Sequence, residues 1–128
     1  MTYQEFIEPI VEQFTTGTYY REVFEAKQAY FDKAGVVYED DAEFEHRMNI
    51  FLDWFIYDRE LPGVDLPPMK YYYRKNKDSL SPEDAAQTKE LCETIHSIFR
   101  LKRKTMNRKG FVIRDLFSGA THKVVDEN

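Results

Sequence analysis

Hydrophobic residues between Phe44 and Leu61 recur with the period of an α-helix. Five of them fall at i, i+4, i+7, i+8 and i+11 and therefore share one helical face: Phe44, Met48, Phe51, Leu52 and Phe55. Ile50, Trp54 and Ile56 widen this face beyond the stripe of an ordinary surface helix. The pattern predicts a central core helix in which Trp54 is buried.

A first helix is predicted at the N-terminal end of the sequence. Thr2 and Glu5 have the spacing of a capping box, in which each side chain accepts a hydrogen bond from the other residue's backbone N–H. Apolar residues at helical spacing follow. Because Pro9 has no N–H to donate inside a helix, this helix is predicted to begin near Glu8 or to bend there.

A second helix is predicted between two glycines. Gly17 ends the first helix, Thr18 can act as the N-cap of the second, and Gly35 stands where a helix commonly ends. The acidic run 39–43 then precedes the core helix. Asp40 and Glu43 have capping-box spacing in that run, and its acids favour the positive end of the helix dipole.

The segment 61–68 is rich in proline and turns the chain, and its last two prolines can open a fourth, short helix. A fifth helix has the clearest local signal in the sequence. Ser81 is its predicted N-cap and Pro82 its first residue, and its pattern continues to about His96.

After Ser97 the period of the hydrophobic residues changes from 3.6 to 2. Residues 98–106, 111–117 and 121–125 are predicted strands, joined by turns at 107–110 and 118–120. The fold class is therefore α+β, with about five helices around a central aromatic helix and a C-terminal three-stranded antiparallel β-meander. We expect a single domain over residues 1–128, with a helical part at 1–96 and the meander at 97–125.

Composition supports one sizeable core, since the 128 residues are 42% hydrophobic and 16% aromatic. Charge is distributed unevenly. Residues 1–66 contain 5 Lys or Arg and 15 Asp or Glu, whereas residues 67–128 contain 13 and 8. The basic half is either a patch for an anionic partner or a layer that meets the acidic half of the same or a neighbouring molecule. The second interpretation, or plain solvation, is favoured.

Several features predict a cytoplasmic protein without a membrane span. The first residues lack the basic and apolar segments of a secretory signal, and Cys92 has no second cysteine with which to form an intramolecular disulfide. Asp53 and Asp58 interrupt the one apolar run that resembles a membrane span.

Sequence motifs for metal, cofactor or catalysis are not found. Cys92 and His96, at i and i+4, make only a two-ligand fragment, and the acidic run 39–43 lacks the alternation and central glycine of a calcium loop. Phosphate-binding glycine loops and the common hydrolase motifs do not occur. We therefore predict no metal, no cofactor and no enzymatic activity.

A polar stripe runs along the core helix at i, i+3, i+7, i+11 and i+14: His46, Asn49, Asp53, Tyr57 and Glu60. In one interpretation it is a functional seam, in which Asp53 orients His46 or binds a partner's donor. In the other it is the solvated side of the helix or a hydrogen-bonded seam against another helix, and this is favoured because no nucleophile or second ligand lies nearby. Arg47 and Asp58, at the edge of the stripe, are predicted to be structural clamps.

The strongest candidate for a binding site is a basic stretch in the meander, in which residues 100–114 contain no acid. Its candidate residues are Arg100, Lys102, Lys104, Arg108, Lys109 and Arg114. Period 2 predicts that Arg100, Lys102 and Lys104 share one face of the first strand. Such a face can lie on phosphates, but it lacks the aromatic side chains that stack on bases, which disfavours nucleic acid.

Three stretches resemble a group of uncharacterised small bacterial proteins: EAKQAYFDKAG, VVYEDDAEFEHRMNIFLDWFIYDREL, and SIFRLKRK followed by IRDLFSG. In this group an F-x-x-W-F/Y-x-x-D-R helix precedes a short β unit that ends in a D-L-x-x-G turn. The resemblance covers about residues 25–125 and is most specific from Phe51 to Arg59. It implies a bacterial origin and a cytoplasmic location, with no assigned activity and no catalytic residue.

Together these patterns favour a non-enzymatic cytoplasmic protein–protein interaction module or adaptor with a protein partner. The alternative is binding of nucleic acid or of an anionic ligand such as a nucleotide through the basic meander. The sequence indicates neither the partner nor the oligomeric state.

Overall fold

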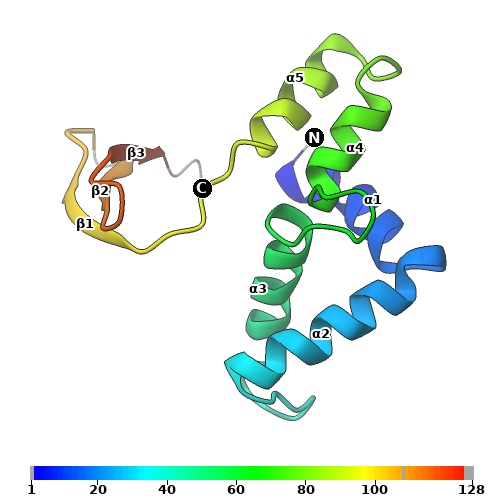
Figure 1. Cartoon of the computed structure of the whole chain (residues 1–128). Helices are drawn as coiled ribbons and strands as arrows, with labels where there is room; N and C mark the ends of the chain where they lie inside the picture. Colours follow the sequence, from blue (N-terminus) through cyan, green and yellow to red (C-terminus); the bar gives the residue numbers. More distant parts are fainter. Residues whose placement is uncertain (1, 108, 126–128) are drawn as a thin grey trace. The chain divides into compact units, whose positions relative to one another are not determined.

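The computed structural model describes residues 2–107 and 109–125 (Figure 1). Within them the chain forms five α-helices, a turn of 3-10 helix and a three-stranded antiparallel sheet, so the predicted α+β class is confirmed. The chain divides into two compact units, Met1–Thr94 and Ile95–Asn128, and each is described by itself. The expectation of a single domain stays a prediction.

Helix α1 (Tyr3–Thr15) begins at the predicted capping box. Thr2 Oγ1 accepts a hydrogen bond from Glu5 N at 3.2 Å, and Glu5 Oε2 accepts one from Thr2 N at 2.9 Å. The prediction that the helix starts near Glu8 is wrong, because this box fixes its start and Pro9 lies inside it. The helix continues through Pro9 although this residue has no N–H to donate. Ile7, Ile10 and Phe14 are its buried residues.

The 3-10 turn η1 (Gly17–Tyr19) separates α1 from α2 (Tyr20–Ala34). Thr18 lies in this turn, so its predicted role as N-cap is wrong. At the other end of α2, Gly35 has a φ of 96°, a backbone conformation that residues with a side chain rarely adopt. Arg47 donates hydrogen bonds to the carbonyl oxygens of Ala34, Gly35 and Val36, and thus acts as a clamp on the last turn of the helix.

Helix α3 (Phe44–Tyr57) carries the centre of the aromatic core. Phe51 is fully buried, and its ring centroid lies 5.4 Å from that of Tyr30 and 5.7 Å from that of Phe31, both on α2. Trp54 is only partly buried, with its ring 5.2 Å from Tyr30. Ile50 is 45% exposed, so its predicted place in the apolar face is wrong.

The predicted capping box before α3 does not form. Glu43 occupies the N-cap position without a side-chain hydrogen bond to the helix. Asp41 stabilises the turn before the helix instead, because its Oδ2 accepts a hydrogen bond from Tyr38 N at 2.8 Å. Spacing alone could not distinguish this turn from a capping box.

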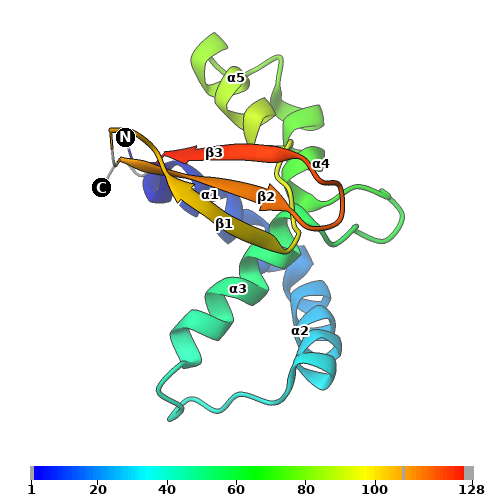
Figure 2. The same ribbon diagram turned by 90° about the vertical axis from the view of Figure 1, so that its left-hand side faces the viewer.

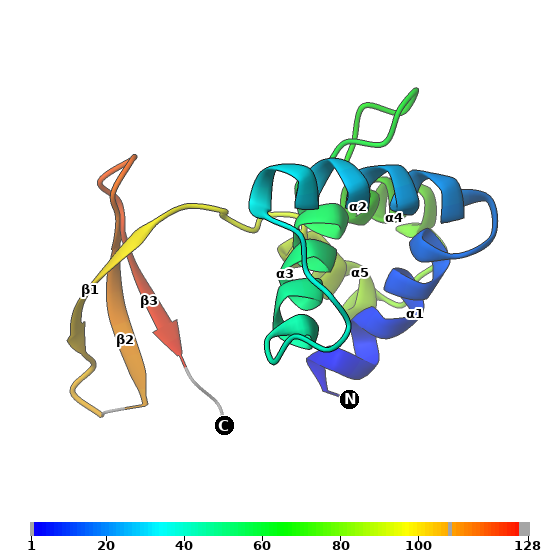
Figure 3. The same ribbon diagram turned by 90° about the horizontal axis from the view of Figure 1, so that it is seen from below.

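Helices α4 (Pro68–Asn76) and α5 (Pro82–Leu91) complete the helical unit. The predicted cap of α5 is confirmed, since Ser81 Oγ accepts a hydrogen bond from Asp84 N at 3.1 Å. The helix ends at Leu91 rather than near His96, so Cys92 and His96 do not share a helical turn. Helices α1, α2 and α3 all contact one another, α4 contacts α1 and α3, and α5 contacts α4 (Figures 1 and 3).

The second unit is the predicted meander, with strands β1 (Phe99–Lys104), β2 (Gly110–Asp115) and β3 (Thr121–Val125). The strands are antiparallel in the order β1-β2-β3, with β2 in the middle (Figure 2). The pairing of β1 with β2 shifts between Leu101 and Arg103. This bulge leaves Lys102 as the extra residue, and it exchanges the two faces of β1 beyond that point.

Phe51 is the residue on which we expect the stability of the helical unit to depend most strongly. Phe51→Ala should lower the free energy of unfolding by about 3–5 kcal/mol, because it leaves a cavity among the rings of Tyr30, Phe31 and Phe55. Urea denaturation followed by helical circular dichroism measures the loss. Ile50→Ala, on the same helix but exposed, is the control and should cost less than about 1 kcal/mol. Equal small losses for both variants would contradict the assigned core.

Candidate functional site

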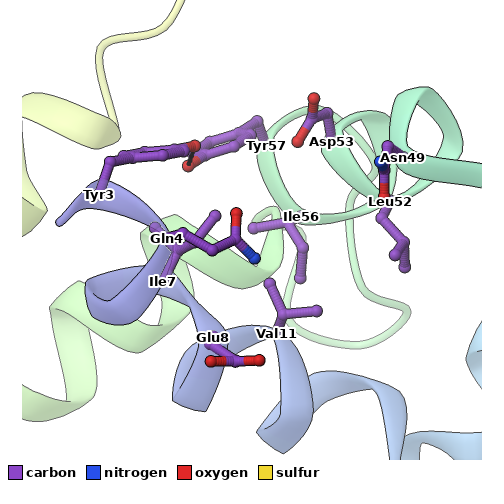
Figure 4. A pocket seen from close by; sticks show the side chains of 10 residues that line it. All are labelled: Tyr3, Gln4, Ile7, Glu8, Val11, Asn49, Leu52, Asp53, Ile56 and Tyr57. Carbon is purple, nitrogen blue, oxygen red and sulfur yellow. Dashed lines mark hydrogen bonds between the residues drawn. The ribbon is translucent and has the colours of Figure 1, made fainter. Parts of the chain in front are cut away.

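A cleft of about 560 Å³ lies between α1 and α3 (Figure 4). Four aliphatic side chains form its apolar part: Ile7, Val11, Leu52 and Ile56. Its polar part consists of two tyrosines, two amides and two carboxylates: Tyr3, Tyr57, Gln4, Asn49, Glu8 and Asp53. The lining contains no Lys, Arg or His, so its formal charge is negative.

The two tyrosines join the helices across one end of the cleft. Tyr3 of α1 and Tyr57 of α3 point toward each other, and their hydroxyl oxygens are 2.6 Å apart (Figure 4). Burial raises the pKa of both phenols above the ordinary value, and for Tyr57 the hydrogen bond with Tyr3 raises it further. Both hydroxyls are therefore protonated at neutral pH, and after one has donated to the other a proton remains for a third group.

Asp53 lies next to this pair on α3 (Figure 4). Asp53 remains exposed to solvent, and its partial burial raises the pKa of its carboxyl group above the ordinary value. Within the described ranges neither Asp53 nor Glu8 forms an ion pair or a side-chain hydrogen bond. The cleft therefore carries two carboxylates of exposed residues without a cation among its lining residues, an arrangement that a cationic ligand can pair with.

Three residues of the predicted polar stripe, Asn49, Asp53 and Tyr57, come together in this cleft. His46 does not line it and is exposed on the first part of α3. No hydrogen bond joins His46 to Asp53 in the part of the chain that the structure describes. The hydrogen bond between the hydroxyl groups of Tyr57 and Tyr3 fits the interpretation of a hydrogen-bonded seam against another helix.

Sequence reasoning missed the contribution of α1. Gln4, Glu8 and Val11 fall at i, i+4 and i+7 and share one face of that helix, which was a detectable signal. The sequence prediction for this helix considered its cap, Pro9 and its apolar positions, and did not consider the polar residues Gln4 and Glu8 on this face. That this face meets the stripe of α3, which lies far away in sequence, follows from the tertiary fold alone.

A second hollow of about 380 Å³ lies beside α2 and the segment 36–44. Its apolar lining consists of Phe24, Phe31, Val36, Val37, Tyr38 and Phe44. Three of these side chains are largely exposed: Phe24 at 51%, Val36 at 62% and Tyr38 at 64%. Exposed aromatic groups that border a hollow are typical of surfaces that bind other proteins.

The meander places the predicted basic residues differently from expectation. Residues directly opposite in an antiparallel sheet point to the same face, so one face, called the basic face below, carries Arg100, Arg103, Arg114 and Lys123. The prediction that Arg100, Lys102 and Lys104 share a face is wrong, because the bulge pairs Lys104 with Phe111 on the other, apolar face. Lys109 is exposed in the turn between β1 and β2, and Arg108 lies outside the described residues.

Other chemistry-bearing groups lie elsewhere. Burial raises the pKa of the Cys92 thiol, whose Sγ donates to the Met69 carbonyl oxygen at 3.6 Å, so it is a poor nucleophile. Within residues 2–107 and 109–125, no three His, Cys, Asp or Glu side chains gather into a metal-binding group. None of the described helices combines the length and the apolar character needed to span a membrane.

These features define an α+β chain with an acidic, hydroxyl-lined cleft in its helical unit and a basic face on its sheet. The chain belongs to a family of unknown function (DUF7986), whose model matches residues 1–128. The resemblance to a group without an assigned activity is thereby confirmed. No curated protein and no solved structure matches the chain.

Because the pKa of Asp53 is raised in the folded state, ionisation of its carboxyl group should oppose folding. The free energy of unfolding should fall as the pH rises through the window between the ordinary aspartate pKa and the raised one. Asp53→Asn removes this term. We expect the variant to gain stability over the wild type at pH of about 7 and to lose that gain at pH of about 3.

Urea denaturation at both pH values measures the difference. Asp32→Asn, an exposed position on α2, is the control for loss of one surface charge. An Asp53→Asn effect of the same size at both pH values would contradict the raised pKa.

Proposed function

We propose that the chain is a non-enzymatic protein–protein interaction module, or adaptor, whose α1–α3 cleft receives a Lys or Arg side chain of a partner protein. One observation carries the proposal: the cleft combines two carboxylates, two amides and two hydroxyls with an aliphatic floor, and no Lys, Arg or His lines it. The occupant must therefore supply both a cation and an apolar body.

Lys and Arg side chains have this combination. Their aliphatic stems can pack against Ile7, Leu52 and Ile56, while the charged head reaches the carboxylates of Asp53 and Glu8. A hydrogen bond between ionised groups is stronger than a neutral one, and a cation beside Asp53 favours the ionised form of this partly buried, solvent-exposed carboxyl group. The remaining tyrosine proton and the amide oxygens can form hydrogen bonds that orient the bound side chain.

Two features of the same unit support a protein as the source of this side chain. Residues 1–94 contain 10 Lys or Arg and 20 Asp or Glu, a formal charge of −10 that steers a basic partner toward the unit. Phe24, Val36 and Tyr38 expose apolar surface beside the second hollow. A small free cation would also be attracted by this charge, but it would not use the exposed apolar surface.

The groups of the cleft support binding rather than catalysis. Its phenols are protonated at neutral pH, and its lining contains neither a thiol nor an imidazole. A location in the bacterial cytoplasm is part of the proposal. It is supported by the resemblance described above. It is also supported by the single cysteine, because a chain with one cysteine cannot form the intramolecular disulfides that stabilise many proteins of oxidising compartments.

The alternative function is binding of an anion through the meander. A separate observation supports it, because Arg100 lies directly opposite Arg114. The basic face offers Val112, Thr121 and Val125 between its cations and no aromatic side chain. Nucleic acid is disfavoured on this ground, because bases would find no ring on which to stack.

The adaptor proposal is tested by affinity purification from the native cell with three forms of the full chain as bait. These are the wild type, the cleft variant Glu8→Gln/Asp53→Asn, and the matched control Glu12→Gln/Glu45→Gln. The control removes one exposed carboxylate from each of the same two helices outside the cleft. We expect a partner that the wild type and the control retain and that the cleft variant loses.

Photo-crosslinking from position 52 then identifies the partner segment, and calorimetry measures the affinity of the corresponding peptide. Replacing its Lys or Arg by Met should weaken binding by about tenfold or more, since a charged hydrogen bond contributes about 1.5–3 kcal/mol. Three results would contradict the proposal. They are equal retention by all baits, a crosslinked segment without Lys or Arg, and binding of n-butylammonium as tight as that of the peptide.

A further inference from the structure

Two arginines oppose each other on the basic face of the meander. Arg100 of β1 is the direct cross-strand partner of Arg114 of β2. Like charges in this position destabilise a sheet, because the two side chains extend side by side. In the described part of the chain neither arginine forms an ion pair or a hydrogen bond.

The nearest carboxylate in the sheet is engaged elsewhere. Asp115 Oδ1 accepts hydrogen bonds from Ser97 Oγ at 2.8 Å, Phe117 N at 2.8 Å and Ser118 N at 3.2 Å. The bond from Ser97 and those from the turn hold the pKa of Asp115 below its ordinary value. Its register places it on the apolar face, with Phe99. Asp115 therefore organises the β2–β3 turn and does not neutralise the arginine pair.

A hollow of about 450 Å³ lies at this pair. Arg100, Arg114 and Lys102 line it, together with Leu101, Leu116, Asp115 and Gly119. A Cβ atom added to Gly119 would stand 3.7 Å from Arg114 Nη2, so the guanidinium lies against the turn. Three cations and one carboxylate give the lining a formal charge of +2. Leu116 is its apolar side chain next to the pair, since the register of Leu101 with Ile113 places the Leu101 side chain on the apolar face.

We propose that this hollow binds a phosphomonoester, with the phosphate between Arg100 and Arg114 and an apolar or aromatic group against Leu116. Guanidinium groups match the geometry of phosphate oxygens, and an ammonium adds a third charge. A dianion between the arginines converts their repulsion into attraction. Lys102, the extra residue of the bulge, supplies this ammonium group, since it also lines the hollow.

A small phosphate ester fits better than a nucleic acid strand. The hollow is a single site, and the basic face around it has no aromatic side chain for stacking. This inference rests on the second unit alone. It does not depend on the α1–α3 cleft.

The test is an NMR titration of the isotope-labelled full chain with phenyl phosphate and with inorganic phosphate at constant ionic strength. We expect the amide signals of Arg100, Arg114 and Gly119 to shift, and phenyl phosphate to bind several-fold more tightly than inorganic phosphate because its ring covers Leu116. Arg114→Gln should weaken phenyl phosphate binding by about tenfold or more. Lys123→Gln is the control, since Lys123 shares the basic face but does not line the hollow.

A second readout separates loss of binding from loss of the fold. Without ligand, Arg114→Gln should slow hydrogen exchange of the β2 amides, because it removes the like-charge pair. Phenyl phosphate should slow that exchange further in the wild type and not in the variant. Equal binding by wild type and Arg114→Gln would overturn the proposal. So would binding of a generic single-stranded oligonucleotide that is tighter than that of phenyl phosphate and equally lost in Lys123→Gln.

Discussion

Burial of Phe51 is the interaction on which the rest of the helical unit depends. Its ring packs against Tyr30 and Phe31 of α2 and against Trp54 and Phe55 of its own helix. This contact fixes the rotation of α3 about its axis. The flank that carries Asp53 and Tyr57 is thereby left for α1, where the hydrogen bond between the two tyrosines closes one end of a cleft. The candidate site is thus a consequence of how the aromatic core is packed.

Both candidate sites hold charge that the chain does not neutralise by itself. In the cleft, partial burial opposes the ionisation of the exposed residue Asp53, and no cation lines the same space. In the meander, Arg100 faces Arg114 across two strands. Each arrangement lowers the stability of its unit, and such local conflicts are expected where a ligand restores the balance. The signs differ, with a formal charge of −10 for residues 1–94 and +5 for residues 95–128, so the two sites favour ligands of opposite charge.

Local patterns in the sequence correctly predicted those features of the fold that depend on residues close together in the chain. The caps at Thr2 and Ser81 and the change of period after Ser97 are all present in the structure. The predictions failed where a tertiary or irregular feature intervened: the 3-10 turn that contains Thr18, and the bulge that turns Lys104 to the apolar face. The polar stripe of α3 was visible in the sequence. Its partner Tyr3 was not, because 54 residues separate it from Tyr57 and only the core packing brings the two together.

The central claim is that the Asp53 carboxylate is a receptor for a basic side chain. Carbon-13 NMR of the side-chain carboxyl groups in the full chain tests it most directly, with the pKa of Asp53 followed with and without N-butylguanidinium as a mimic of arginine. A bound cation stabilises the ionised form, so the account predicts that the raised pKa falls toward its ordinary value while the signals of the meander stay in place. An Asp53 pKa that does not change at saturating guanidinium, or shifts confined to residues 95–125, would contradict it.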